Sequence, residues 1–91
     1  MNSKVYYCVI NHNLNFTNNK NTIIFRTLEE ATEYASEKCQ VDIDIYKETV
    51  TPLSTVHIYE VNYGEIIDVH KANYYVYKDT KDFSIKIVKR N

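Results

Sequence analysis

Hydrophobic and polar side chains alternate with a period of two along much of this chain, as they do in half-buried β-strands. The pattern predicts strands over residues 4–10, 22–26, 55–61, 65–71, 73–78 and 83–89. The last four strands follow one another through short connections, which favours a meander in which neighbours in sequence pair. An asparagine-rich polar tract over residues 11–21 is predicted to connect the first two strands.

One segment, TLEEATEYASEK at residues 27–38, has helical periodicity instead. Thr27 followed by Glu30 forms a capping box, in which the threonine hydroxyl accepts from an orphan amide and the glutamate reaches back to the cap. The helix is therefore predicted to begin at Leu28 and to end near Gln40. Its apolar stripe consists of Leu28, Ala31, Ala35 and Cys39, with Tyr34 at the margin. The small alanines predict that this helix lies close to a sheet.

The period changes again after the helix. Over residues 41–46 the apolar Val41, Ile43 and Ile45 alternate with Asp42, Asp44 and Tyr46. This indicates a strand, although continuation of the helix stays open from the sequence alone. Residues 49–54 contain Pro52 and are predicted to form a loop, because proline supplies no ladder donor and restricts the residue before it. The whole pattern predicts an α+β fold, a single helix packed on a mostly antiparallel sheet in the order β-β-α-(β)-β-β-β-β.

The register of the predicted meander depends on the turn at residues 62–64. The last of these residues, Gly64, supplies the positive φ that a hairpin loop of this length requires. Such a loop would place His57 opposite Val69, so that His57 and His70 point to opposite faces of the sheet. A loop one residue shorter or longer would pair His57 with His70, and that alternative stays open.

A second turn is predicted at residues 79–82. It would place Tyr75 opposite Lys86 and leave Tyr75 and Tyr77 on the outer face beside that lysine. The side chains predicted to lie in the core are Tyr74, Val76, Phe83, Ile85 and Ile87. Tyrosine and cationic side chains are enriched in binding interfaces, so the outer patch is a candidate for partner binding. The simpler explanation is that tyrosine favours strands.

Length and composition point to one small ordered domain over residues 1–91, with 44% hydrophobic residues, one glycine and one proline. A domain of this size buries only about 60–65% of the surface of its unfolded chain, which favours function at the surface over a deep catalytic cleft. No apolar run has the length of a membrane span, and no signal-peptide pattern is present, so a cytoplasmic protein is expected. Abundant Asn, Lys, Ile and Tyr suggest an AT-rich genome, such as that of a low-GC bacterium or a phage, with the host cytoplasm as the compartment if the source is viral.

The chain carries no motif of a known catalytic site. It lacks a P-loop, an HExxH pair and a serine-centred elbow. Cys8 lies within an apolar strand and Cys39 near a helix C-terminus, where a thiolate is disfavoured, so both thiols are predicted to be inert. His57 and His70 lack a third metal ligand nearby. The sequence therefore predicts a non-enzymatic protein with no catalytic residue, no metal and no cofactor.

Charge is distributed unevenly, although the net charge is only −1. Acidic residues concentrate in residues 29–48 and basic residues in residues 78–90. The helix dipole and the cap explain the glutamates of the first turn, whereas Glu33 and Glu37 lie further along and repel each other by a few tenths of a kcal/mol. A solvated helix face is the simplest explanation. The alternative is a surface that attracts a basic partner, to which Asp42 and Asp44 would add if they lie on the same side.

These patterns predict an interaction protein, in its sharpest form a phage- or virus-encoded inhibitor of a host defence or nucleic-acid-handling protein. The expected partner-binding residues are Glu33, Glu37, Asp42, Asp44, Tyr75, Tyr77 and Lys86. The alternative is a nucleic-acid or small-ligand binding module that stacks bases on the tyrosines of the last hairpin. Exposed sheet edges leave a homodimer open.

The segment at residues 24–35, following the strand at residues 5–10, resembles the strand-to-helix stretch of the small hybrid-binding domain found at the start of some ribonucleases H. Its TLEEA stretch is also similar to HicB-type antitoxins. The shared part is mostly the capping box, and the Gly and Trp landmarks of the first family and the Gly-rich middle of the second are missing. Neither resemblance therefore implies a function for this chain.

Overall fold

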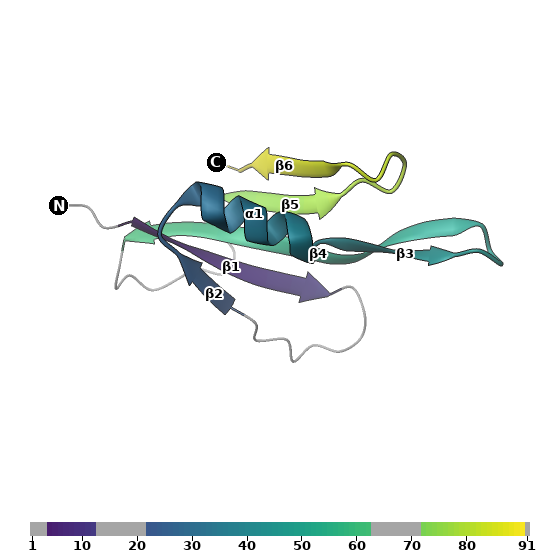
Figure 1. Cartoon of the computed structure of the whole chain (residues 1–91), viewed down its shortest axis with the longest axis horizontal. Coiled ribbons are helices and arrows are strands. Elements are labelled where there is room, and N and C mark those ends of the chain that lie inside the picture. Colours follow the sequence, from purple (N-terminus) through teal and green to yellow (C-terminus); the bar gives the residue numbers. More distant parts are fainter. Residues whose placement is uncertain (1–3, 13–21, 63–71, 91) are drawn as a thin grey trace.

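The computed structural model describes residues 4–12, 22–62 and 72–90, which form one helix packed on one face of an antiparallel sheet (Figure 1). The elements are β1 (Lys4–His12), β2 (Thr22–Phe25), α1 (Leu28–Lys38), β3 (Gln40–Asp44), β4 (Thr49–Asn62), β5 (Tyr74–Lys78) and β6 (Ile85–Lys89). The strand order is β2-β1-β4-β5-β6, and β3 pairs with β4 outside this path. The predicted fold class is therefore confirmed.

Helix α1 begins where the capping residues predict. The backbone N–H of Glu30 donates to Thr27 Oγ1 at 3.2 Å, and that hydroxyl donates to Glu30 Oε1 at 2.9 Å. The glutamate thus bonds the cap side chain. The helix ends at Lys38, and the extended Cys39 donates its N–H to the carbonyl of Ala35 at 3.0 Å. Both ends thus lie close to their predicted positions.

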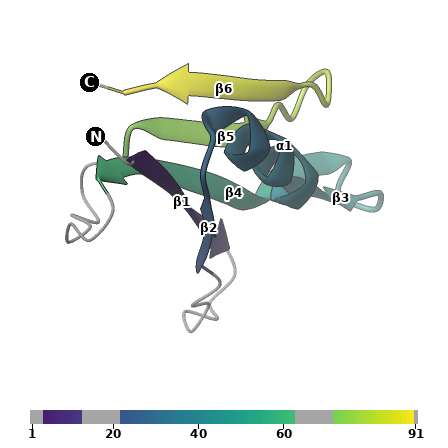
Figure 2. The same cartoon turned by 60° about the vertical axis from the view of Figure 1, so that its left-hand side comes forward.

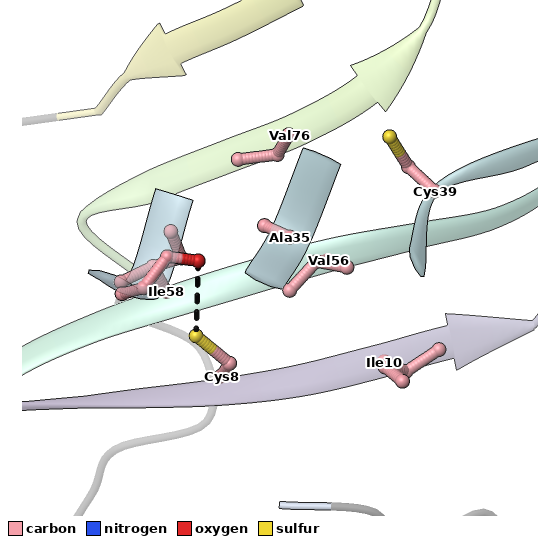
Figure 3. Packing of buried hydrophobic residues seen from close by; sticks show 8 residues of the cluster. Cys8, Ile10, Ala35, Cys39, Val56, Ile58 and Val76 are labelled. Carbon is pink, nitrogen blue, oxygen red and sulfur yellow. Dashed lines mark hydrogen bonds between the residues drawn. The ribbon is translucent and has the colours of Figure 1, made fainter. Parts of the chain in front are cut away.

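The core lies between α1 and the middle strands of the sheet. Its buried members are Cys8, Ile10, Ala31, Ala35, Cys39, Val56, Ile58 and Val76. Figure 3 shows the aliphatic side chains of β4 and β5 gathered beneath the helix, with Cys8 of β1 beside them. Cys8 Sγ lies 3.6 Å from the carbonyl oxygen of Ala31, which is close because no bulky side chain separates the helix from the strand. The predicted close approach of helix and sheet is confirmed.

The segment after the helix differs from the prediction in one respect. β3 confirms a strand near residues 41–46 and excludes continuation of the helix. The loop predicted at residues 49–54 is wrong, because β4 begins at Thr49 and Pro52 stands opposite Val41. Proline is tolerated in strands at edges and bulges, and the β3–β4 register shifts just beside this pair.

β3 and residues 49–53 of β4 form a two-stranded ribbon, here called the arm, that projects from the body of the molecule (Figures 1 and 2). β1 pairs with β4 only from Ser54 onward, so the arm extends past the end of that pairing. The radius of gyration is 14.1 Å, compared with about 12 Å for a compact domain of this length. The side chain of Tyr46 at the tip is 94% exposed. The arm is not predictable from the sequence pattern, because Pro52 indicates a loop over half of it.

The two hairpin turns, between β3 and β4 and between β5 and β6, are built in the same way. Asp44 and Asp79 each precede the loop, and Oδ1 of each accepts the N–H groups of the second and third residues that follow, at 2.7 to 3.4 Å. Near the end of each turn, Glu48 and Phe83 have positive φ values of 54° and 60°. Such angles suit glycine, and a bulky side chain there carries a conformational cost.

Changing Phe83 to glycine is expected to raise the free energy of unfolding by a few tenths to about 1 kcal/mol. Glycine adopts the left-handed backbone without steric cost, which stabilises the folded state. Its larger conformational entropy in the unfolded chain offsets part of this gain. Urea denaturation of the wild type and the variant measures the difference. Thr80→Gly in the same loop is the control and should be destabilising. A loss of stability in Phe83→Gly would mean instead that packing of the phenylalanine ring outweighs the strain.

The register of the last hairpin also differs from the prediction. Val76 stands opposite Ile87, where a turn at residues 79–82 would have placed Ile85. The loop is longer because the N–H of Asp79 bonds the carbonyl of Ser84 at 2.8 Å, and this bond draws two more residues into the turn. A shift by two residues leaves every side chain on its predicted face but changes its partner.

The predicted core membership of β6 is wrong. Phe83, Ile85 and Ile87 are 47%, 36% and 49% exposed, whereas Val76 is buried as predicted and Tyr74 is partly buried against the core. β6 is the last strand of the sheet, and helix α1 packs on β1, β2, β4 and β5. The apolar side chains of β6 are exposed because this helix leaves the edge strand uncovered.

The predicted pairing of residues 55–61 with residues 65–71 is wrong at residues 56–58, which pair with β5 instead. His57 has Val9 as its ladder partner on one side and Tyr75 on the other, so both sides of β4 are occupied there. The strand predicted at 65–71, with its glycine turn and His70, lies outside the described residues.

Candidate functional site

An open hollow lies beside α1 on the helix side of the sheet, with a volume of about 260 Å³. It is lined by Phe25, Glu30, Glu33, Tyr34 and Glu37. Phe25 ends β2, two residues before the helix cap, and its ring centre lies 5.3 Å from that of Tyr34 at an interplanar angle of 45°. The three glutamates follow one another at helical spacing. The arrangement combines two aromatic rings with three carboxylates and is called the acidic hollow below.

The carboxylates of the acidic hollow are unequal. Glu30 accepts from the cap hydroxyl, whereas Glu33 and Glu37 are exposed and have no hydrogen bond or ion pair to any residue that the structure describes. Their mutual repulsion at i and i+4 is therefore uncompensated there. Lys38 Nζ lies 5.6 Å from the ring centre of Tyr34, which shows that this ring accepts a cation. The hollow therefore combines exposed carboxylates with a ring that already has the ammonium group of Lys38 near it.

The other two predicted acidic residues lie outside the hollow, on the arm. Asp44 Oδ1 accepts backbone N–H groups of the turn at 3.0 and 3.1 Å, so this carboxylate has a structural role. Asp42 stands opposite Thr51 and is exposed. By strand alternation the two aspartates share the face of the arm opposite that of Val41 and Ile43. They add negative charge beyond the C-terminal end of α1 without lining the same cavity.

A second candidate surface lies on the face of the sheet that α1 leaves uncovered. The ring centres of His57 and Tyr75 are 5.2 Å apart, and those of Tyr75 and Tyr77 are 5.4 Å apart. Lys86 stands opposite Tyr77, whereas the predicted register would have placed it opposite Tyr75. The predicted tyrosine patch thus forms, although its tyrosines are half-buried. The three rings are called the aromatic row below.

His57 is the member of the aromatic row that the sequence pattern does not predict for this patch. Burial lowers its pKa, and the nearby charge of Arg90 lowers it further. The imidazole is therefore neutral at pH 7. No group of three metal-ligating side chains exists among the residues that the structure describes.

Both thiols lie in the core. Cys8 has no exposed surface and Cys39 is 1% exposed. Burial raises the pKa of the Cys8 thiol to about 12 and also raises that of Cys39. Neither side chain has the lowered pKa or the exposure that a nucleophile needs.

Both thiols of the native chain are expected to resist alkylation by iodoacetamide at pH 8 and to react at once in denaturant. Only the thiolate reacts, and burial removes both the thiolate and the access of the reagent. Mass spectrometry of the native and the unfolded chain measures the difference. Fast modification of Cys8 in the native state would show that helix α1 opens readily from the sheet.

The sequence contains a signal for the hollow in two aromatic residues. Phe25 is the last residue of a β-branched run and lies just before the cap, so its ring must come close to the first turns of the helix. Tyr34 lies at the margin of the apolar stripe of the helix. A side chain at this position can be partly covered by a neighbouring strand and partly exposed. Together they mark an aromatic floor beside the acidic positions.

No family model, curated protein or solved structure matches this chain. No helix in the described ranges has both the length and the apolar character needed to cross a bilayer.

Proposed function

We propose that this chain is a non-enzymatic binding protein that docks on a basic segment of a protein partner, with a lysine or arginine side chain of the partner in the acidic hollow. The observation that carries the proposal is the placement of Glu33 and Glu37, exposed and unpaired among the described residues, beside the rings of Phe25 and Tyr34.

The chemistry of the hollow favours a cationic side chain over other occupants. Carboxylates form charge-assisted hydrogen bonds with ammonium or guanidinium groups, and aromatic faces attract the same cations. The volume of about 260 Å³ is smaller than the roughly 300–1,000 Å³ typical of sites for small organic ligands. A side chain presented by a protein surface therefore fits the hollow better than a free metabolite.

The partner is a protein with a basic surface, because the acidic charge extends beyond the hollow. Asp42 and Asp44 on the arm continue the negative field, which would raise the rate of association with such a partner. The sharpest version is a phage- or virus-encoded inhibitor that covers the basic groove of a nucleic-acid-handling defence protein in the host cytoplasm. The AT-rich amino-acid usage supports this version by association only.

Affinity capture from the source cell, or from its host if the source is viral, tests the proposal. The captured protein is then purified and its direct binding to the chain is measured at low and at physiological salt. We expect a basic protein whose affinity falls as salt rises, because the contacts are charged. A partner that is acidic, or whose binding is independent of salt, would contradict the proposal.

The aromatic row supports a second candidate function, binding of single-stranded nucleic acid. Three adjoining rings with Lys86 beside them offer the combination of stacking faces and cationic charge that such proteins use. Fluorescence anisotropy with labelled single-stranded oligonucleotides tests it. Binding that weakens with salt and is lost in Tyr77→Ala would support this function, and the absence of binding at low salt would eliminate it.

A further inference from the structure

The outer edge of β6 faces no other strand in the part of the chain that the structure describes. β6 has β5 as its single neighbour among the described strands. The N–H of Arg90 bonds the carbonyl of Asn73, and the N–H of Asp79 bonds the carbonyl of Ser84, so the even-numbered residues of this strand direct their backbone groups toward β5. Because these directions alternate in an antiparallel ladder, Ile85, Ile87 and Lys89 direct theirs outward.

The same edge exposes apolar side chains on both faces of the sheet. Ile85 and Ile87 are 36% and 49% exposed on the helix side, and Val88 is 44% exposed on the other side. An edge with free donors, free acceptors and apolar side chains is a template for another strand.

We propose that β6 pairs with β6 of a second copy of this chain, in an antiparallel arrangement with a twofold axis through Ile87. A twofold axis perpendicular to the sheet makes the contact self-complementary and closes the assembly at two copies. The two sheets then join into one, with both α1 helices and both acidic hollows on the same face.

The charges of β6 favour this register over the two nearest symmetric ones. An axis through Ile87 places Ile87 opposite its own copy, Ile85 opposite Lys89, and Lys86 opposite Val88, so no like charges face each other. An axis through Lys86 would oppose two lysines, and an axis through Val88 would oppose Lys86 to Arg90. Ile85, Ile87 and Lys89 direct their backbone groups outward, so the favoured register also pairs every outward donor with an acceptor.

The same test disfavours self-pairing through the middle of β3, at the edge of the arm. In β3 an axis through Asp42 would oppose two copies of that aspartate, and an axis through Ile43 would oppose Asp42 to Asp44. The charge pattern therefore favours a second copy at β6 and disfavours one at β3.

Sedimentation equilibrium of the wild-type chain and of Ile87→Lys tests the proposal. We expect a dimer for the wild type and a dissociation constant about tenfold or more higher for the variant, since two lysines then face each other across the axis. Ile43→Lys on the arm is the matched control, because Ile43 is similarly exposed at 58%, and it should remain dimeric. A monomeric wild type at millimolar concentration, open-ended polymers, or a dimer unaffected by Ile87→Lys would overturn the proposal.

Amide hydrogen exchange of the wild type gives an answer even if the variant fails to fold. The N–H groups of Ile85, Ile87 and Lys89 are expected to be protected, and more so at higher protein concentration, because none of the described strands bonds them and a second copy would. Rapid exchange of these three amides at a concentration where Val88 is protected would overturn the proposal. This result is independent of the function proposed for the acidic hollow, which lies on another part of the molecule.

Discussion

Replacing Ile58 with alanine is expected to lower the free energy of unfolding by about 2–5 kcal/mol. Ile58 is fully buried in the middle of β4, between Cys8 on β1 and Tyr74 on β5, and it belongs to the cluster beneath α1. The loss combines the transfer energy of the removed methyl groups with the cavity that remains. A domain of this size has only about 5–15 kcal/mol of stability, so the variant would be close to unfolding at 37 °C.

Thermal and urea unfolding followed by circular dichroism measure this loss. One kcal/mol corresponds to about 4–8 °C in Tm for a domain of this length. Ile43→Ala on the arm is the matched control, because Ile43 is 58% exposed and its truncation should change stability by less than about 0.5 kcal/mol. Equal losses in the two variants would mean that the core is not centred between α1 and the middle strands.

Reversing both charges in Glu33→Lys/Glu37→Lys is expected to weaken binding to the purified partner about 10- to 100-fold. Each exposed ion pair contributes about 0.2–1 kcal/mol, and reversal replaces attraction with repulsion at two positions. The loss should appear mainly at low salt and partly as a slower association rate. The fold should be preserved, because both side chains are exposed and lysines near the helix C-terminus suit the dipole.

The control for this variant changes the net charge equally outside the hollow. Glu29→Lys/Glu48→Lys alters an exposed residue in the first turn of α1 and one in the turn of the arm, neither of which lines the hollow. Isothermal titration of both double variants against the partner separates a local contact from a general effect of charge. If both variants lose the same affinity, the acidic hollow has no special role.

Local physics made the helix and most strands predictable from the sequence. The cap at Thr27 fixes where α1 begins, since its side chain satisfies an amide that no other nearby group reaches. β1 and β4 contain runs of apolar side chains, and each of these strands has one face against α1. Ala31 and Ala35 predicted the close packing of α1 on the sheet, because their small side chains let the backbones approach each other.

Long-range pairing decided the parts that the sequence did not predict. Pro52 signals a loop by itself, but it lies in a strand because β3 folds back on it beside a register shift. Likewise, the turn between β5 and β6 extends to Ser84 through backbone bonds that no residue preference announces. A period of two identifies which side chains share a face, whereas it does not determine which strand becomes the uncovered edge.

The candidate site was predictable only in part, for a similar reason. Glu33 and Glu37 were identified from their spacing along one helix face. Phe25 became part of the site because β2 pairs with β1, which brings its ring to Tyr34. His57 joined the tyrosines because β4 pairs directly with β5. In both cases a contact between segments distant in sequence supplied the missing member.

Titration of the ¹⁵N-labelled chain with a short peptide of lysine and arginine, followed by NMR, tests the central claim most directly. The account predicts salt-sensitive shifts concentrated at the amides of Phe25, Glu33, Tyr34 and Glu37, and their loss in Glu33→Lys/Glu37→Lys. Shifts concentrated instead at His57, Tyr75 and Tyr77, or no shifts at millimolar peptide and low salt, would contradict it.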